Sequence, residues 1–203
     1  MSPRPTREQT QRQTRARLLA AAAELIADHG VNGTSIEQIA DRAGYSRGAF
    51  YSNFKDKYDL VLELLLDQTR QGIDEVSALD HSTLEPLRQY NRDRAPHITS
   101  WLTLRMELFL HVLRHPELRP RLAEREHLAR TALQAGIEHH FASTGRTPPA
   151  DPAQLALIVH ALEDGLLIQK SLTPDELPDD LAVDAYLLLI RSWTALSDKE
   201  NPT

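Results

Sequence analysis

The stretch that decides the fold is TSIEQIADRAGYSRGAFYSNF, residues 34–54. Its first part places apolar residues at helical spacing, Gly44 breaks that helix, and Ser46 can cap a second, short helix. Phe50 and Phe54 can return to the core that the first helix faces. Two helices joined by a tight turn are typical of the helix-turn-helix, whose second helix enters the major groove of DNA. An ordinary helical hairpin is the alternative.

The front end of the second helix is small and polar, which a core helix would not need. It consists of Ser46, Arg47, Gly48 and Ala49. Gly48 and Ala49 permit close approach to base edges, and the Ala49 methyl group can contact a thymine methyl group. Arg47 can reach a guanine or a phosphate. These four residues are therefore the candidates for reading a DNA sequence.

Helical signals also flank this stretch. Residues 10–29 are predicted to form the first helix, and Thr34 and Glu37 read as a capping box at the start of the next. Asp56 is placed to cap a long helix that runs to about Leu79. The first three helices would then form one small bundle around the helix-turn-helix.

Charge is distributed unevenly along the chain. Residues 1–57 hold nine Lys/Arg and six Asp/Glu, a net charge of +3. Residues 58–203 have a net charge of −9, which gives −6 for the whole chain. A basic end on an acidic body fits a DNA-binding end, although chance sampling can give a difference of this size. Residues 1–11 are expected to be disordered away from DNA, either as a solvated tail or as an arm for the minor groove.

The rest of the chain is predicted to be helical, because no sustained period-two pattern of strand formers occurs. The last two of these helices, at about 151–171 and 179–196, have long apolar surfaces. Paired across a two-fold axis they would make a four-helix dimer interface; the alternative is packing inside one protomer. The expected body helices are 83–93, 96–115, 117–142, 151–171 and 179–196.

Residues 30–65, GVNGTSIEQIADRAGYSRGAFYSNFKDKYDLVLELL, resemble the DNA-binding segment of the TetR family of transcriptional regulators. The resemblance implies an all-α fold of about nine helices. A DNA-binding helix-turn-helix domain would occupy residues 1–55, and a long fourth helix would lead into a ligand-binding and dimerisation domain at 56–203. It also implies a cytoplasmic homodimer, bound to a pseudo-palindromic double-stranded operator and released by a small-molecule effector.

The resemblance also assigns roles to single residues. Tyr51, Lys55, Thr34 and Tyr45 would contact phosphates, which position the protein, while Arg47, Gly48 and Ala49 would supply most of the sequence information. Plain packing is the alternative for the two tyrosines. The implied DNA-binding set is Thr34, Tyr45, Ser46, Arg47, Gly48, Ala49, Tyr51 and Lys55.

The effector site is less defined by the sequence. Trp101, Arg105 and Phe109 follow four-residue spacing, so they share one helix face that suits a planar or anionic organic ligand. A core stripe with a surface arginine is the alternative. The candidate ligand-binding residues, on helices that line the family's pocket, are Tyr90, His97, Trp101, Arg105, Met106, Phe109 and His127.

Other chemistry finds little support in the sequence. There is no cysteine, no Gly-rich phosphate loop, no nucleophile elbow and no HExxH motif, so no enzyme activity and no cofactor are expected. His139, His140 and His160 are interpreted as solvated, and no metal site is expected. No apolar run reaches the length of a signal peptide or membrane span. A ligand-responsive repressor is the leading hypothesis; an architectural DNA-binding protein without a ligand and an unrecognised helical enzyme are the alternatives.

Overall fold

A computed structural model describes residues 6–80 and 83–200, and within these ranges the regular elements are all helices. The chain divides into two compact units, which are described separately. The first comprises residues 1–68 and 100–122, and the second comprises residues 69–99 and 123–203. The all-α prediction is confirmed. The functional boundary expected between residues 55 and 56 stays a prediction.

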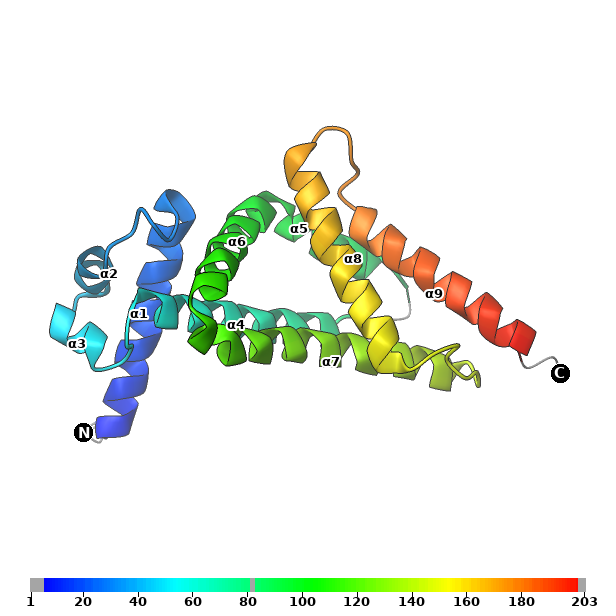
Figure 1. The fold of residues 1–203 in the computed structure, drawn as a ribbon, viewed down its shortest axis with the longest axis horizontal. Helices are drawn as coiled ribbons and strands as arrows, with labels where there is room; N and C mark the ends of the chain where they lie inside the picture. Colours follow the sequence, from blue (N-terminus) through cyan, green and yellow to red (C-terminus); the bar gives the residue numbers. More distant parts are fainter. Residues whose placement is uncertain (1–5, 81–82, 201–203) are drawn as a thin grey trace. The chain divides into compact units, whose positions relative to one another are not determined.

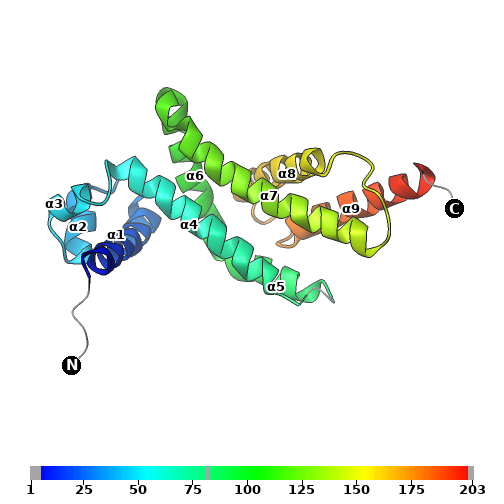
Figure 2. The same ribbon diagram turned by 90° about the horizontal axis from the view of Figure 1, so that it is seen from below.

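The first unit is built around a short helical bundle. Figure 2 shows α2 and α3 beside α1 in this unit. Its elements are α1 (Arg7–His29), α2 (Ile36–Ala43), α3 (Arg47–Tyr51), the start of α4 (Lys57–Ser77), most of α6 (Ile98–Arg114), the 3₁₀ turn Pro116–Leu118 and the start of α7 (Arg119–Ser143).

The core of the first unit joins the helix-turn-helix to α1, α4 and α6. Phe50 of α3 and Phe54, just after it, are fully buried beside Leu18, Ile39 and Leu108. Burial of such side chains is worth about 1.5–3 kcal/mol each, so this cluster fixes how α3 is presented. The expectation that the two phenylalanines are core residues is confirmed.

Two details at helix starts correct the sequence analysis. α1 begins at Arg7 rather than near residue 10, because Thr6 and Gln9 form a capping box. Helix therefore extends through part of the predicted tail, of which residues 1–5 lie outside the described residues. The box at the start of α2 is formed by Ser35 and Gln38, not by Thr34 and Glu37. Cap residues need extended backbone and an accessible side chain, and Ser35 has both whereas Thr34 is buried.

The second unit holds the end of α4, α5 (Glu85–Arg94), the 3₁₀ turn Ala95–His97, most of α7, α8 (Pro152–Leu172) and α9 (Leu181–Glu200). Figure 1 shows α8 and α9 joined by the loop between them. Ile137 and Phe141 of α7 pack with residues of α8 and α9 in one apolar core. In the described residues, no helix has the length and apolar character needed to cross a membrane.

Candidate nucleic-acid interface

The N-terminal end of α3 is capped and open to solvent. Gly44, in the left-handed conformation with φ 77°, ends α2 and turns the chain. Ser46 then caps α3, because its Oγ accepts a hydrogen bond from the backbone N–H of Ala49 at 3.2 Å. Ser46, Arg47 and Gly48 are exposed and Ala49 is half-buried. The sequence prediction of a short, bare helix end is confirmed in its geometry.

Gly48 is not required by the fold. It lies within α3 and does not have a positive φ. A Cβ atom at this position would meet only Ser46 Oγ, at an ordinary 3.6 Å. Glycine in a helix costs about 0.5–1 kcal/mol relative to alanine, and no internal contact of the described structure offsets that cost. An external surface that approaches the backbone of α3 would account for the residue.

The side chain of Arg47 has one partner on α2 and one on α3. Its Nη1 lies 2.8 Å from Oε1 of Glu37, and its Nη2 donates a 3.3 Å hydrogen bond to the hydroxyl of Tyr51. The guanidinium carbon also lies 5.5 Å from the centre of the Tyr51 ring. The hydrogen bond to Tyr51, and then the charge of Glu37, raises the pKa of Arg47 above its ordinary value. The side chain is thus a charged group at the solvent face.

Two further exposed residues, Tyr51 at the end of α3 and Lys55 shortly after it, lie near Arg47 in the sequence. The Tyr51 side chain is 47% exposed, with its ring edge-on to Phe50 at 5.6 Å between centroids. Lys55 is exposed, and its backbone N–H, rather than its side chain, bonds to Asp59 Oδ2 at 2.9 Å. Tyr45 is half-buried against the first core. Tyr51 and Lys55 are therefore open to solvent, whereas Tyr45 is partly covered by the core.

Thr34 is placed differently from the prediction. Its side chain is 1% exposed, and its hydroxyl lies 2.9 Å from the carbonyl oxygen of Gly30 and 3.2 Å from that of Leu25. The Thr34 hydroxyl thus supplies a hydrogen-bond donor to carbonyl groups at the C-terminal end of α1. A phosphate contact from this side chain is contradicted by its burial, and Thr34 is a structural residue.

Arg15 is a structural residue that the sequence analysis counted only as charge. Its guanidinium donates to the carbonyl oxygen of Asn53 at 2.7 Å, pairs with Glu63 at 3.0 Å and lies 4.3 Å from the centre of the Phe54 ring. These contacts tie α1 to the chain that follows α3. No local motif signals such long-range contacts, so only the three-dimensional arrangement reveals them.

Lys57 is a second cation with an internal role. Its Nζ donates to the carbonyl oxygen of Thr34 at 2.8 Å and to that of Val31. Burial lowers the pKa of Lys57, whereas the charge of Glu107 acts in the opposite direction. Glu107 itself accepts a 3.0 Å hydrogen bond from the backbone N–H of Val31. The loop between α1 and α2 is thereby pinned by α4 and α6.

The predicted effector-binding residues are divided between the two units. Trp101 is half-buried against the first core, whereas Phe109 is 49% exposed and Met106 is 36% exposed. Arg105 is half-buried in the same unit, and Tyr90, half-buried, and the exposed His97 and His127 belong to the second. The burial of Trp101 favours a packing role for that side chain; the other assignments stay predictions.

Known protein families match both parts of the chain. The family described as "Bacterial regulatory proteins, tetR family" matches residues 18–64, and the "Tetracyclin repressor-like, C-terminal domain" matches residues 92–192. The HTH-type transcriptional repressor AcnR of Corynebacterium efficiens is 26% identical over 155 residues, which cover 76% of this chain and 80% of that protein. The HTH-type transcriptional regulator AcrR of Shigella flexneri is 44% identical over 61 residues, 30% of this chain and 28% of AcrR.

A similar fold occurs in a solved structure. A crystal structure from Mesorhizobium loti, assigned to the TetR-family transcriptional regulators, superposes with a TM-score of 0.69 at 20% identity. The superposition covers 94% of this chain and 98% of that one. The likeness therefore extends over both units of the fold.

Proposed function

This chain belongs to the tetR family of bacterial regulatory proteins, and we propose that it acts in the cytoplasm as a repressor rather than as an enzyme. Regulators of this family bind DNA and respond to ligands, and the curated relatives that match this chain include proteins named repressors. In this proposal the chain binds a double-stranded operator and dissociates from it when a small molecule binds to the domain predicted at residues 56–203.

The observation that carries the proposal is the exposed N-terminal end of α3. Arg47, Gly48 and Ala49 would read base edges in the major groove, because they lie at the solvent end of a helix fixed by two buried phenylalanines. Tyr51, Lys55 and Tyr45 would contact phosphates. Ser46 would cap α3 by accepting from the backbone N–H of Ala49, and its own O–H would stay available to donate to a phosphate.

We propose that a homodimer forms through α8 and α9. Leu155, Val159 and Trp193 of these helices pack inside the protomer. Another apolar set on the two helices stays in solvent, and a partner would cover it. Its members and exposed fractions are Leu157 49%, Ile158 44%, Ile168 38%, Leu172 71%, Leu188 67% and Leu196 48%.

A two-fold dimer would carry two copies of α3 and would bind a pseudo-palindrome. The half-sites of such operators lie about 34 Å or more apart along the duplex, one helical turn or slightly above. An effector beside Arg105 and Phe109 would act by favouring a conformation that spaces the two copies differently. A coupling of about 5- to 150-fold in operator affinity is typical of such switches.

The test of this function separates positioning from sequence reading. We would select a high-affinity duplex from a random pool and measure binding by fluorescence anisotropy against a scrambled duplex, at several salt concentrations. Tyr51→Phe and Lys55→Ala should weaken both duplexes equally, and Lys55→Ala should reduce the salt slope by about one unit. Equal affinity of the unmodified protein for the selected and scrambled duplexes would contradict sequence-specific binding.

A further inference from the structure

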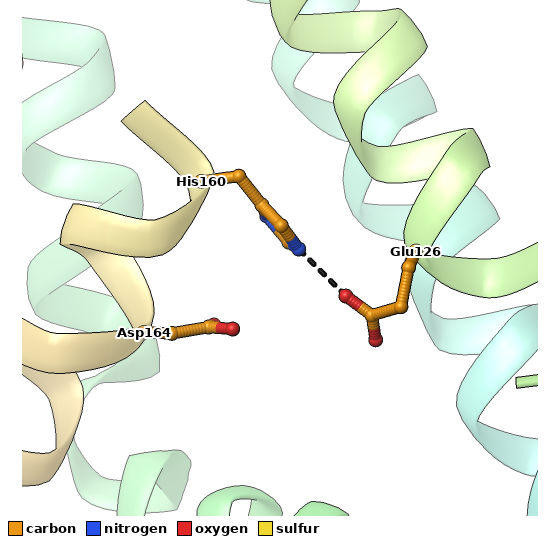
Figure 3. Close-up of side chains that lie close together, drawn as sticks. All are labelled: Glu126, His160 and Asp164. Carbon is orange, nitrogen blue, oxygen red and sulfur yellow. Dashed lines mark hydrogen bonds and ion pairs between the residues drawn. The ribbon is translucent and has the colours of Figure 1, made fainter. Parts of the chain in front are cut away.

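Three metal-ligating side chains meet in the second unit, away from the surface assigned to DNA. Glu126 comes from α7, and His160 and Asp164 come from α8. One ligand atom from each lies within 4.8 Å of the other two. Figure 3 shows the imidazole of His160 and the carboxylates of Glu126 and Asp164 directed into one gap between the helices. This cluster is the strongest chemical feature that DNA recognition does not use.

The half of this cluster that lies on α8 has a local signal in the sequence. His160 and Asp164 are four residues apart, so a helix places them on one face, one turn apart. His139 and His140, which were considered together with His160, are elsewhere: His140 Nε2 lies 3.2 Å from Thr194 Oγ1, and His139 is exposed. Glu126 is distant in sequence, and only the packing of α7 against α8 brings it to the pair.

His160 and Glu126 are held in place by burial and by hydrogen bonds. His160 is 8% exposed, although it is a polar side chain, and its Nε2 lies 2.7 Å from Glu126 Oε2. The other oxygen of Glu126, Oε1, accepts a 2.9 Å hydrogen bond from Arg125, which also donates to Thr69 Oγ1 at 2.9 Å. Glu126 is therefore held from one side by Arg125 while its second oxygen faces His160 and the gap.

The carboxylate of Glu126 lies between His160 and Arg125. Burial raises the pKa of Glu126, but the hydrogen bond with His160 and the charge of Arg125 outweigh that effect and lower the pKa to about 2. The carboxylate is thus ionised at neutral pH. A cation placed in the gap would face carboxylate oxygens of both Glu126 and Asp164, which lie within 4.8 Å of each other.

The contact of 2.7 Å between His160 Nε2 and Glu126 Oε2 has the geometry of a hydrogen bond or ion pair. Asp164 offers a carboxylate oxygen within 4.8 Å of both groups. A cation that replaced the Nε2 proton of His160 would therefore lie within reach of all three side chains.

We propose that Glu126, His160 and Asp164 form a binding site for a divalent transition-metal ion of the Zn²⁺ class. One imidazole nitrogen and two carboxylate oxygens are ligands that Zn²⁺ accepts, whereas Mg²⁺ and Ca²⁺ prefer oxygen alone. Three protein ligands leave a coordination position for water or for an anionic group of a small molecule. Metal binding would join α7 to α8 inside the second unit.

The test uses the full-length protein without DNA, so that its outcome is independent of the proposed function. After treatment with a chelator, the protein is titrated with Zn²⁺ by calorimetry and with Co²⁺ by visible absorption. We expect one ion per protomer, a rise in melting temperature with Zn²⁺ concentration, and no comparable effect of Mg²⁺. Failure of the unmodified protein to bind Zn²⁺ and Co²⁺ would overturn the proposal.

Matched variants decide whether these three residues hold the ion. Asp164→Asn and Glu126→Gln keep the shape of each side chain but remove a ligand charge from α8 and from α7, respectively. Each should weaken Zn²⁺ binding at least about tenfold, a typical effect of losing part of a metal site. His139→Ala removes an exposed histidine and should bind as the unmodified protein does. Unchanged affinity in both carboxylate variants, with normal circular dichroism, would show that the ion lies elsewhere.

Discussion

Oε1 of Glu37 on α2 lies 2.8 Å from Nη1 of Arg47 on α3, so the cation assigned to base reading is paired when DNA is absent. Both side chains are more than half exposed, at 53% and 62%, and such surface pairs contribute little to stability. The pair matters more as a competitor, because Arg47 must exchange the carboxylate for DNA. Glu37 also brings a negative charge near the phosphates.

Replacement of Glu37 by Gln should therefore strengthen DNA binding without altering the fold. We expect affinity to rise by about two- to fivefold for all duplexes, since the lost repulsion is independent of sequence. Anisotropy titrations with selected and scrambled duplexes provide the measurement. Glu24→Gln is the control, because Glu24 forms a similar exposed pair with Arg42. Weaker binding of the Glu37 variant would show that the pair orients Arg47 productively.

Gly48→Ala should separate stability from DNA binding. The added methyl group meets no close neighbour, so the free energy of unfolding should rise by about 0.5–1 kcal/mol. Operator affinity should fall by about tenfold or more, because the methyl group blocks the close approach of α3 to base edges. Urea unfolding and anisotropy test the two effects.

The control for this substitution is Gly136→Ala in α7. Gly136 is also helical, and a Cβ atom there meets nothing within 4 Å. It should gain similar stability with unchanged operator affinity. If Gly48→Ala binds the operator normally, the backbone of α3 does not approach DNA closely.

Thr34→Val should destabilise the first unit. The buried carbonyl groups at the end of α1 would lose their hydroxyl donor, at a cost of about 1–3 kcal/mol in the free energy of unfolding. Thr34→Ser keeps the hydroxyl and should lose less. Operator affinity per folded molecule should not change for either variant, because the side chain is buried. Reduced affinity with unchanged stability in Thr34→Val would restore the phosphate contact.

Leu188→Glu should convert the dimer into a monomer. Leu188 is 67% exposed on α9, and a charge there would be buried without a partner in the proposed interface. Light scattering coupled to size exclusion should give half the mass, and operator affinity should fall with it. Leu84→Glu, at a position 41% exposed outside α8 and α9, should remain dimeric. A dimeric Leu188→Glu protein would place the interface elsewhere.

The helices and the exposed N-terminal end of α3 could be predicted from the sequence because their signals are local. Gly44 and Ser46 stand beside the helix ends that they determine, and the apolar spacing identifies the faces of α2 and α3. The contact made by Arg15 with Asn53 spans 38 positions, and that between Glu126 and His160 spans 34. Such pairs depend on packing rather than on spacing. Thr34 and Ser35 are both acceptable caps by type, and only burial distinguishes them.

The most direct test of the central claim compares the DNA sequences chosen by the unmodified protein with those chosen by Arg47→Ala. Selection from a random duplex pool, followed by sequencing, should give an inverted repeat for the unmodified protein. Arg47→Ala should keep the repeat but lose about 5- to 150-fold of preference at one position in each half-site, whereas Arg42→Ala on α2 should keep the full pattern. Identical patterns for all three proteins would reduce Arg47 to a phosphate contact. The absence of any enriched pattern for the unmodified protein would contradict sequence reading by α3.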